Sequence, residues 1–175
     1  MLSQNKRATM GISRVARICV VLLICCQAQA QAQFNKQEVQ TLLDLTERLL
    51  KARQDLIDLS ESLARAQGAM NTYNCVRELY HELVFMGDRV SFSTDLLTLN
   101  TKMVNDQDKV TINKVISRNA VFDLYNLEES RRNISHLISS CSSSPAVANY
   151  ARMSLSFVSE AERSFSSISN RLPRP

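Results

Sequence analysis

The sequence predicts an all-α protein, an elongated up-down bundle of three to four long helices with one disulfide. The first observation is that apolar residues within 39–66 recur at alternating steps of three and four, the spacing of a helix packed lengthwise on another helix. The second is that the 175 residues include only three glycines and three prolines, so strand and turn signals are scarce. The third is a pair of cysteines, Cys75 and Cys141, which alternating helices would bring to one end of the bundle.

The first 32 residues have the composition of a secretory signal. Basic residues precede an apolar run over 18–26, which is too short for the roughly 20 residues that span a bilayer. Alanines at alternate positions then form A-x-A sites, with cleavage expected after Ala30 or Ala32. We therefore expect 1–32 to be a signal peptide and 33–175 to be a single helical-bundle domain, exported to the periplasm or the extracellular space. A retained N-terminal anchor is the alternative.

Removal of this segment changes what charge and cysteine content imply. Its four basic residues are lost, which leaves 17 Lys and Arg against 17 Asp and Glu. This balance argues against a basic surface for nucleic acid. Cys19, Cys25 and Cys26 are lost as well, and the remaining Cys75 and Cys141 predict one disulfide in an exported protein.

The first helix is expected from Asn35 to about Gly68. Asn35 and Glu38 have the spacing of a capping box, Phe34 suits a hydrophobic staple, and Gly68 suits a helix end. The expected seam consists of Leu42, Leu45, Leu49, Ala52, Leu56, Leu59, Leu63 and Ala66. A second apolar row widens the face enough for two neighbouring helices. That row consists of Leu43, Leu50, Ile57 and Ala64.

The second helix is expected over 70–105 as one long arm. Gly87 is the place where this arm would bend or break. Phe85, Met86 and Phe92 make its middle apolar on several sides. That pattern predicts either an exposed patch for a partner or deeper burial.

The segment after Asn105 leaves two alternatives open. A polar turn over 105–109 is followed by β-branched residues that suit a short strand as well as a helix. Helical spacing resumes from Ala120 to Cys141, although Arg131 stands where an apolar residue is due. A four-helix bundle is therefore weighed against three helices with an irregular region over 104–118.

The last helix is expected after a serine-rich loop over 140–145. Ser144 suits the N-cap and Pro145 the first helical position. In an alternating bundle, the turns near Gly68 and Ser144 lie at the same end, which makes a Cys75–Cys141 bridge geometrically natural.

One motif would carry metal chemistry if it were complete. Glu78 and His81 form a Glu-x-x-His pair, as in the di-iron sites of four-helix bundles. Such a site needs a second pair, but Asn133 stands three residues before the other histidine, His136. We therefore interpret His81 as a surface or partly buried histidine rather than a ligand, and we expect no metal and no cofactor.

Other catalytic patterns do not appear in the sequence. Three glycines are too few for a phosphate-binding loop, and neither histidine is flanked by residues that suggest a serine triad. Cys75 and Cys141 are assigned to the bridge rather than to nucleophilic chemistry. We expect no catalytic residues and no enzymatic activity.

The A-x-A signal, the Gln-rich start QAQAQFNKQEVQTLLDL and the long amphipathic helices resemble the small exported helical subunits of type IV secretion and conjugation systems. The resemblance covers most of the mature chain and transfers no functional residue. It implies an accessory or minor-pilus component that binds protein partners through apolar helix faces or associates with itself. Nucleic acid is not expected as a partner, and a membrane is expected only through export or envelope assembly. A periplasmic helical binding or chaperone-like protein is the alternative.

Overall fold

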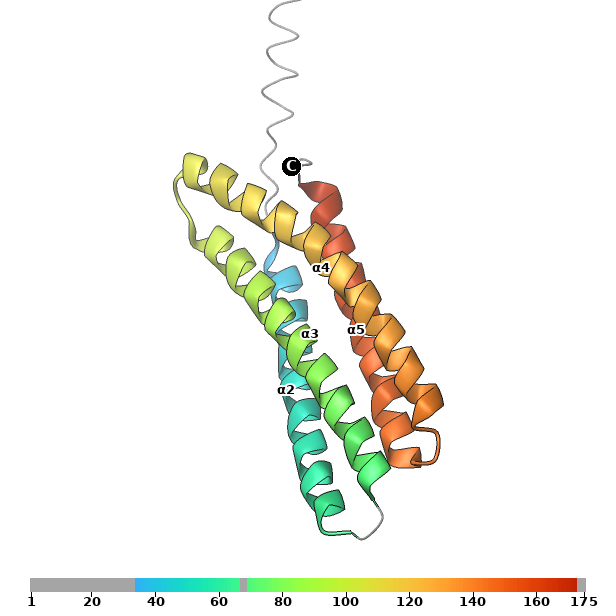
Figure 1. The fold of residues 1–175 in the computed structure, drawn as a ribbon. Coiled ribbons are helices and arrows are strands. Elements are labelled where there is room, and N and C mark those ends of the chain that lie inside the picture. Colours follow the sequence, from blue (N-terminus) through green and yellow to red (C-terminus); the bar gives the residue numbers. More distant parts are fainter. Residues whose placement is uncertain (1–33, 67–68, 173–175) are drawn as a thin grey trace, which may run out of the picture. The chain divides into compact units, whose positions relative to one another are not determined.

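The computed structural model describes residues 34–66 and 69–172, which form four α-helices and no strand (Figure 1). α2 spans Lys36–Ala64, α3 spans Met70–Lys102, α4 spans Asp106–Ser140 and α5 spans Pro145–Arg171. Successive helices alternate in direction, so the predicted all-α up-down bundle is confirmed.

Each helix packs against its neighbours in the sequence, and α5 also contacts α2. Packing is most extensive within the pairs α2/α3 and α4/α5, and it is light between α2 and α5. Side chains from all four helices fill the core. The largest fully buried ones include Leu42, Leu49, Leu83, Leu97, Ile134 and Phe165.

α2 begins as the sequence predicts. The Asn35 side chain accepts a hydrogen bond of 2.8 Å from the Glu38 amide, and Glu38 accepts one of 3.1 Å from the Asn35 amide. Phe34 is buried beside this cap. The first five residues of the expected seam are buried, whereas Leu59 and Leu63 are half-buried because they lie near the helix end at Ala64.

The second apolar row of α2 corrects our expectation. Leu43 and Leu50 are 40% and 54% exposed, because α2 meets α3 along its seam and only lightly meets α5. The row is therefore largely free surface rather than a second packed face.

α3 is one continuous helix through Gly87. Gly87 is buried, and its hydrogen leaves room for the side chains of Leu49 and Arg53 on α2. Close packing of two helices therefore accounts for this glycine better than a break does.

α4 resolves the alternatives for residues 104–118 in favour of a helix. Asn105 caps it by accepting a hydrogen bond of 2.9 Å from the Gln107 amide, and Asp106 and Asp108 lie in its first turn, where acids favour a helix. Ile116 is buried on this helix, so tertiary packing overrides the strand preference of the β-branched residues. The strand and the three-helix arrangement are both wrong.

Arg131, which interrupts the apolar pattern of α4, faces α5. Its guanidinium pairs with Glu162 and donates a hydrogen bond of 3.1 Å to Ser159. An interhelical ion pair thus takes the place of an apolar contact. On α5, Ser144 is the N-cap and Pro145 the first helical residue, although the Ser144 side chain makes no capping bond.

The predicted disulfide between Cys75 and Cys141 is present. The Cα atoms are 6.1 Å apart, and the bridge joins the start of α3 to the end of α4. It links two residues separated by 66 positions in the sequence.

The expected signal peptide, its cleavage sites and the role of Gly68 concern positions outside the described residues. Within 34–66 and 69–172, no helix is long and apolar enough to cross a membrane.

Candidate interaction surface

The interface between α3 and α4 is unusually polar for a bundle interior. Ser93 on α3 donates a hydrogen bond of 2.8 Å to Asp123 on α4, and both are buried. About two turns further towards the loop, Asn100 donates a hydrogen bond of 2.8 Å to Asn113, and these two are also buried. The bonds fix how far α3 is shifted along α4, because each buried polar group needs its particular partner.

Asp123 is the buried charge of this interface. Burial raises the pKa of its carboxyl above the ordinary 3.8, while hydrogen bonds from Ser93 and Arg89 act in the opposite direction. Arg89 lies 3.2 Å from the carboxylate and keeps 29% of its side chain exposed. The acid is therefore interior and its partner reaches the surface.

The Arg89 guanidinium also lies against two aromatic rings. It is 5.0 Å from the ring centre of Phe85 on the same helix and 4.5 Å from that of Phe122 on α4. Both distances lie within the range of cation–π attraction. Arg89 thus holds an aromatic residue of α3 next to one of α4.

Apolar residues continue from these two rings along both helices. Phe92 and Leu99 follow Phe85 at intervals of seven, and Val115 precedes Phe122 by seven, so each set lies on one helix face. We call these five residues the α3–α4 strip. Their exposed fractions lie between 39% and 53%: Phe85 40%, Phe92 53%, Leu99 46%, Val115 39% and Phe122 51%.

The sequence indicated only part of this surface. The sequence left open whether Phe85, Met86 and Phe92 form an exposed patch or are buried. Phe85 and Phe92 are exposed, whereas Met86 is fully buried. Sequence reasoning missed Leu99, Val115 and Phe122, and it missed Arg89 and Asp123 altogether. The seven-residue interval from Phe85 to Leu99 was the available signal.

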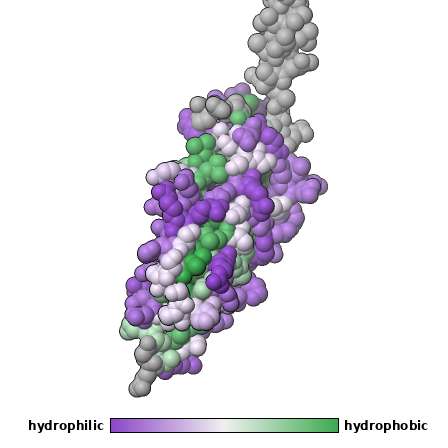
Figure 2. Space-filling model, turned by 90° about the vertical axis from the view of Figure 1, so that its right-hand side faces the viewer, coloured by the Kyte–Doolittle hydropathy of each residue, from purple (hydrophilic) through white to green (hydrophobic). Residues whose placement is uncertain are grey.

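Apolar surface occurs elsewhere as well. Figure 2 shows hydrophobic patches among hydrophilic residues on the side of the bundle that faces right in Figure 1. Leu50 on α2 and Val121 and Tyr125 on α4 are each more than half exposed. The α3–α4 strip differs from these in the cation that joins its two helices.

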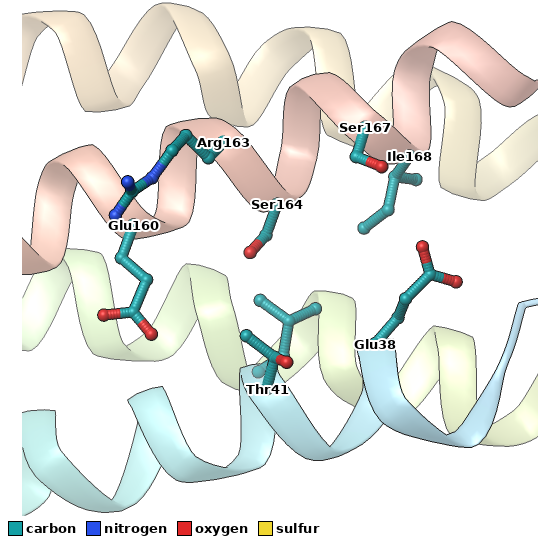
Figure 3. Close-up of a pocket in the computed structure, with 8 residues that line it drawn as sticks. Glu38, Thr41, Glu160, Arg163, Ser164, Ser167 and Ile168 are labelled. Carbon is teal, nitrogen blue, oxygen red and sulfur yellow. The ribbon is translucent and has the colours of Figure 1, made fainter.

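A shallow groove of about 390 Å³ lies between α2 and α5 (Figure 3). Glu38 and Thr41 extend from α2, and Ser164 and Ile168 extend towards them from α5. Ion pairs between α2 and α5 involve two of the lining residues: Glu38 with Arg171, and Glu160 with Arg48. The groove follows from the light α2/α5 packing. Its lining consists of hydroxyls, paired acids, the guanidinium of Arg163 and two aliphatic residues, and it contains no nucleophile–base pair.

The Glu78 and His81 pair is not completed by further ligands. In the described part of the chain, no group of three or more His, Cys, Asp or Glu side chains is placed to hold a metal ion. His81 and His136 are both exposed.

Several serines of α4 and α5 donate hydrogen bonds to carbonyls of their own helices. Ser135, Ser154 and Ser159 each donate to the carbonyl four residues earlier, at 2.7 to 3.0 Å. This is the usual behaviour of serine within a helix.

Comparisons of this chain with protein-family profiles, with curated proteins and with solved structures found no match.

Proposed function

We propose that this protein is an exported, non-catalytic helical component of a larger assembly, and that it binds protein through the α3–α4 strip. The assembly that the chain's layout favours is a secretion or conjugation apparatus, in which the protein would be an accessory or minor-pilus component. Recognition in this proposal is by helix packing and needs no cofactor.

The observation that carries the proposal is the α3–α4 strip itself. Half-exposed side chains of this size present roughly 100 Å² each, so the strip offers about 500 Å² of apolar surface. That is near the upper end for the largest patch on a monomer, where patches are often functional. The buried Asp123 and Arg89 hold the two helices beneath it in one arrangement, which lowers the entropy lost on binding.

Two features support export. The bridge between Cys75 and Cys141 is typical of oxidising compartments, and residues 1–32 have the composition of a cleavable signal. Mass spectrometry of exported protein tests this: we expect a mature N-terminus at Gln31 or Gln33 and no free thiol. Protein with residue 1 intact, or with two alkylated cysteines, would contradict it.

Site-specific photo-crosslinking tests the binding surface. A photoreactive amino acid replaces Phe92 in the strip or, as the control, Leu50, which is equally exposed but lies on α2. We expect protein adducts from position 92 and few from position 50 when the producing cells are irradiated. Equal labelling from both positions, or none from position 92, would remove the strip as the binding surface.

The apparatus is tested separately. The genes beside the one for this chain should encode envelope-spanning secretion or conjugation proteins, and its deletion should reduce transfer or secretion. Neighbours of unrelated function and unchanged transfer would refute this part of the proposal while leaving the binding surface in place.

The groove between α2 and α5 favours a second candidate, a periplasmic binding or chaperone-like protein. Carbon atoms of the surrounding side chains provide most of its lining surface, above the buried Leu42 and Ile168, so an apolar segment of a client would fit against it. Suppression of aggregation of a reduced, unfolded client protein tests this. The activity should fall on Ser164→Arg, which fills the groove, and persist on Phe92→Asp; the reverse pattern would favour the α3–α4 strip.

A further inference from the structure

We propose that the α3–α4 strip binds the same strip of a second copy of this chain, in a dimer whose two-fold axis runs parallel to α3 and α4. The inference rests on the proposed function, because it names the partner of that surface. Three properties of the strip support it: the alignment of its side chains, the charges at its edges and its area.

The alignment follows from the buried hydrogen bonds. Ser93 meets Asp123 and Asn100 meets Asn113, so Phe92 lies level with Phe122, and Leu99 lies level with Val115. A half-turn about an axis parallel to the helices keeps these levels and places α3 of one copy on α4 of the other. Phe92 then meets Phe122 of the second copy, and Leu99 meets Val115 of the second copy. The strip is therefore complementary to itself at these two levels, whereas Phe85 lies level with Glu129 of the second copy.

The edge of the strip on α3 carries two acids, Asp88 and Asp95, and ends at Lys102. Asp88 pairs with Arg53 of α2 at 3.6 Å, so this side of α3 is turned away from α4. Asp95 follows Asp88 by seven residues and lies on the same side. It is exposed and makes no ion pair within residues 34–66 and 69–172.

The edge of the strip on α4 carries one basic residue, Arg118. Arg118 precedes Asp123 by five residues, a spacing that turns it about 140° away from the side of α4 that faces α3. It is exposed and, like Asp95, has no ionic partner in the described ranges. Asp95 precedes Asn100 by five residues, and Arg118 follows Asn113 by five. Because Asn100 and Asn113 are hydrogen-bonded across antiparallel helices, the two charges lie at the same height along the helix axes.

These edges select one of the two ways to pair the strips face to face. The axis parallel to the helices exchanges the edges, so each Asp95 meets Arg118 of the second copy. An axis perpendicular to the helices would place α3 on α3, with each acidic edge against the other, which is unfavourable. Charge complementarity thus favours the parallel axis.

The area is sufficient for a reversible dimer. Two strips of about 500 Å² remove roughly 1,000 Å² from water, the lower limit for a specific interface. We therefore expect monomer and dimer to coexist as the concentration changes.

Sedimentation velocity of the full chain over a range of concentrations tests the dimer. We expect Phe92→Asp to make the protein monomeric and Leu50→Asp, on α2, to leave it unchanged. Both variants keep the apolar residues 18–26, so association through that segment would affect them equally. A monomeric parent chain, or equal association of both variants, would overturn the proposal.

Charge reversal tests the orientation. Asp95→Arg and Arg118→Asp each place like charges together, and each should weaken dimerisation about tenfold. The double variant D95R/R118D restores opposite charges and should return the dissociation constant to within about threefold of the parent value. Absence of this recovery would refute the parallel axis.

The photo-crosslinked adduct at position 92 separates this inference from the proposed function. An adduct made of two copies of this chain supports both. An adduct with a different protein, together with a monomeric parent chain, would refute the dimer and leave the proposed function standing. Absence of any adduct would refute both.

Discussion

Arg89 on α3 donates a hydrogen bond of 3.2 Å to Asp123 on α4, and the same guanidinium contacts Phe85 and Phe122 at the surface. One side chain therefore connects a buried carboxylate to an exposed apolar strip. This contact, with the Ser93 and Asn113 bonds, ties α3 to α4 through buried polar groups. Such bonds are specific for one alignment, whereas apolar side chains tolerate sliding.

The first prediction concerns the contribution of Asp123 to stability. Asp123→Ala leaves Ser93 and Arg89 without their acceptor and creates a cavity between α3 and α4. We expect the free energy of unfolding to fall by about 2 kcal/mol in urea denaturation at pH 7. The control Glu61→Ala, at an exposed acid of α2 away from the α3–α4 strip, should change it by less than about 0.5 kcal/mol. Equal effects of the two substitutions would show that the buried network adds nothing to stability.

The second prediction is a pH dependence with a defined sign. Because burial raises the pKa of Asp123 above 3.8, the folded protein binds more protons than the unfolded chain just above that pH. The resulting stabilisation is complete below pH 3.8 and is lost as the pH rises through the folded pKa. Asp123→Asn cannot ionise, so the unfolding free energy of the parent minus that of the variant should decrease as pH rises above 3.8. Urea denaturation between pH 3 and 8 measures it, and an increase with pH would mean that the Arg89 bond outweighs burial.

Much of the fold could be predicted because it depends on local signals. The cap at Asn35, the proline at position 145 and the seam from Leu42 to Leu56 act within one helix, and each appears as predicted. The Cys75–Cys141 bridge followed from the count of cysteines outside the signal segment and from helix direction. The helix over 106–118 could not be predicted, because the local sequence suits both a strand and a helix. Packing of residues such as Ile116 decides in favour of the helix.

The surface was harder to predict because it depends on which face of each helix is covered. Leu50 on α2 and Leu56 on the same helix are both leucines, yet one is 54% exposed and the other fully buried. Their spacing does not say how widely α5 contacts α2. Likewise, the partnership of Arg89 with Asp123 joins residues 34 positions apart and leaves no mark in either local pattern.

The third prediction concerns the disulfide. Replacing both Cys75 and Cys141 by Ser removes a link between residues 66 positions apart, and we expect the free energy of unfolding to fall by about 4 kcal/mol, chiefly because the unfolded chain gains freedom. Urea denaturation with and without reductant measures this. Reductant should destabilise the parent chain and have no effect on the double variant. A loss below about 1 kcal/mol would mean that α3 and α4 are already held in place by their other contacts.

The fourth prediction concerns Gly87, where helix propensity and packing oppose each other. Alanine at this position favours the helix by up to about 1 kcal/mol. Its Cβ would lie 3.2 Å from the Arg53 guanidinium, which is the end of a flexible side chain. That guanidinium pairs with the exposed carboxylate of Asp88 at 3.6 Å. Since Arg53 can move towards solvent, we expect Gly87→Ala to stabilise the protein by about 0.5 kcal/mol. Gly87→Leu instead forces a large side chain against Leu49 and should destabilise it by about 2 kcal/mol. Thermal and urea unfolding of the two variants decide the matter, and destabilisation by alanine would show that Arg53 is fixed between α2 and α3.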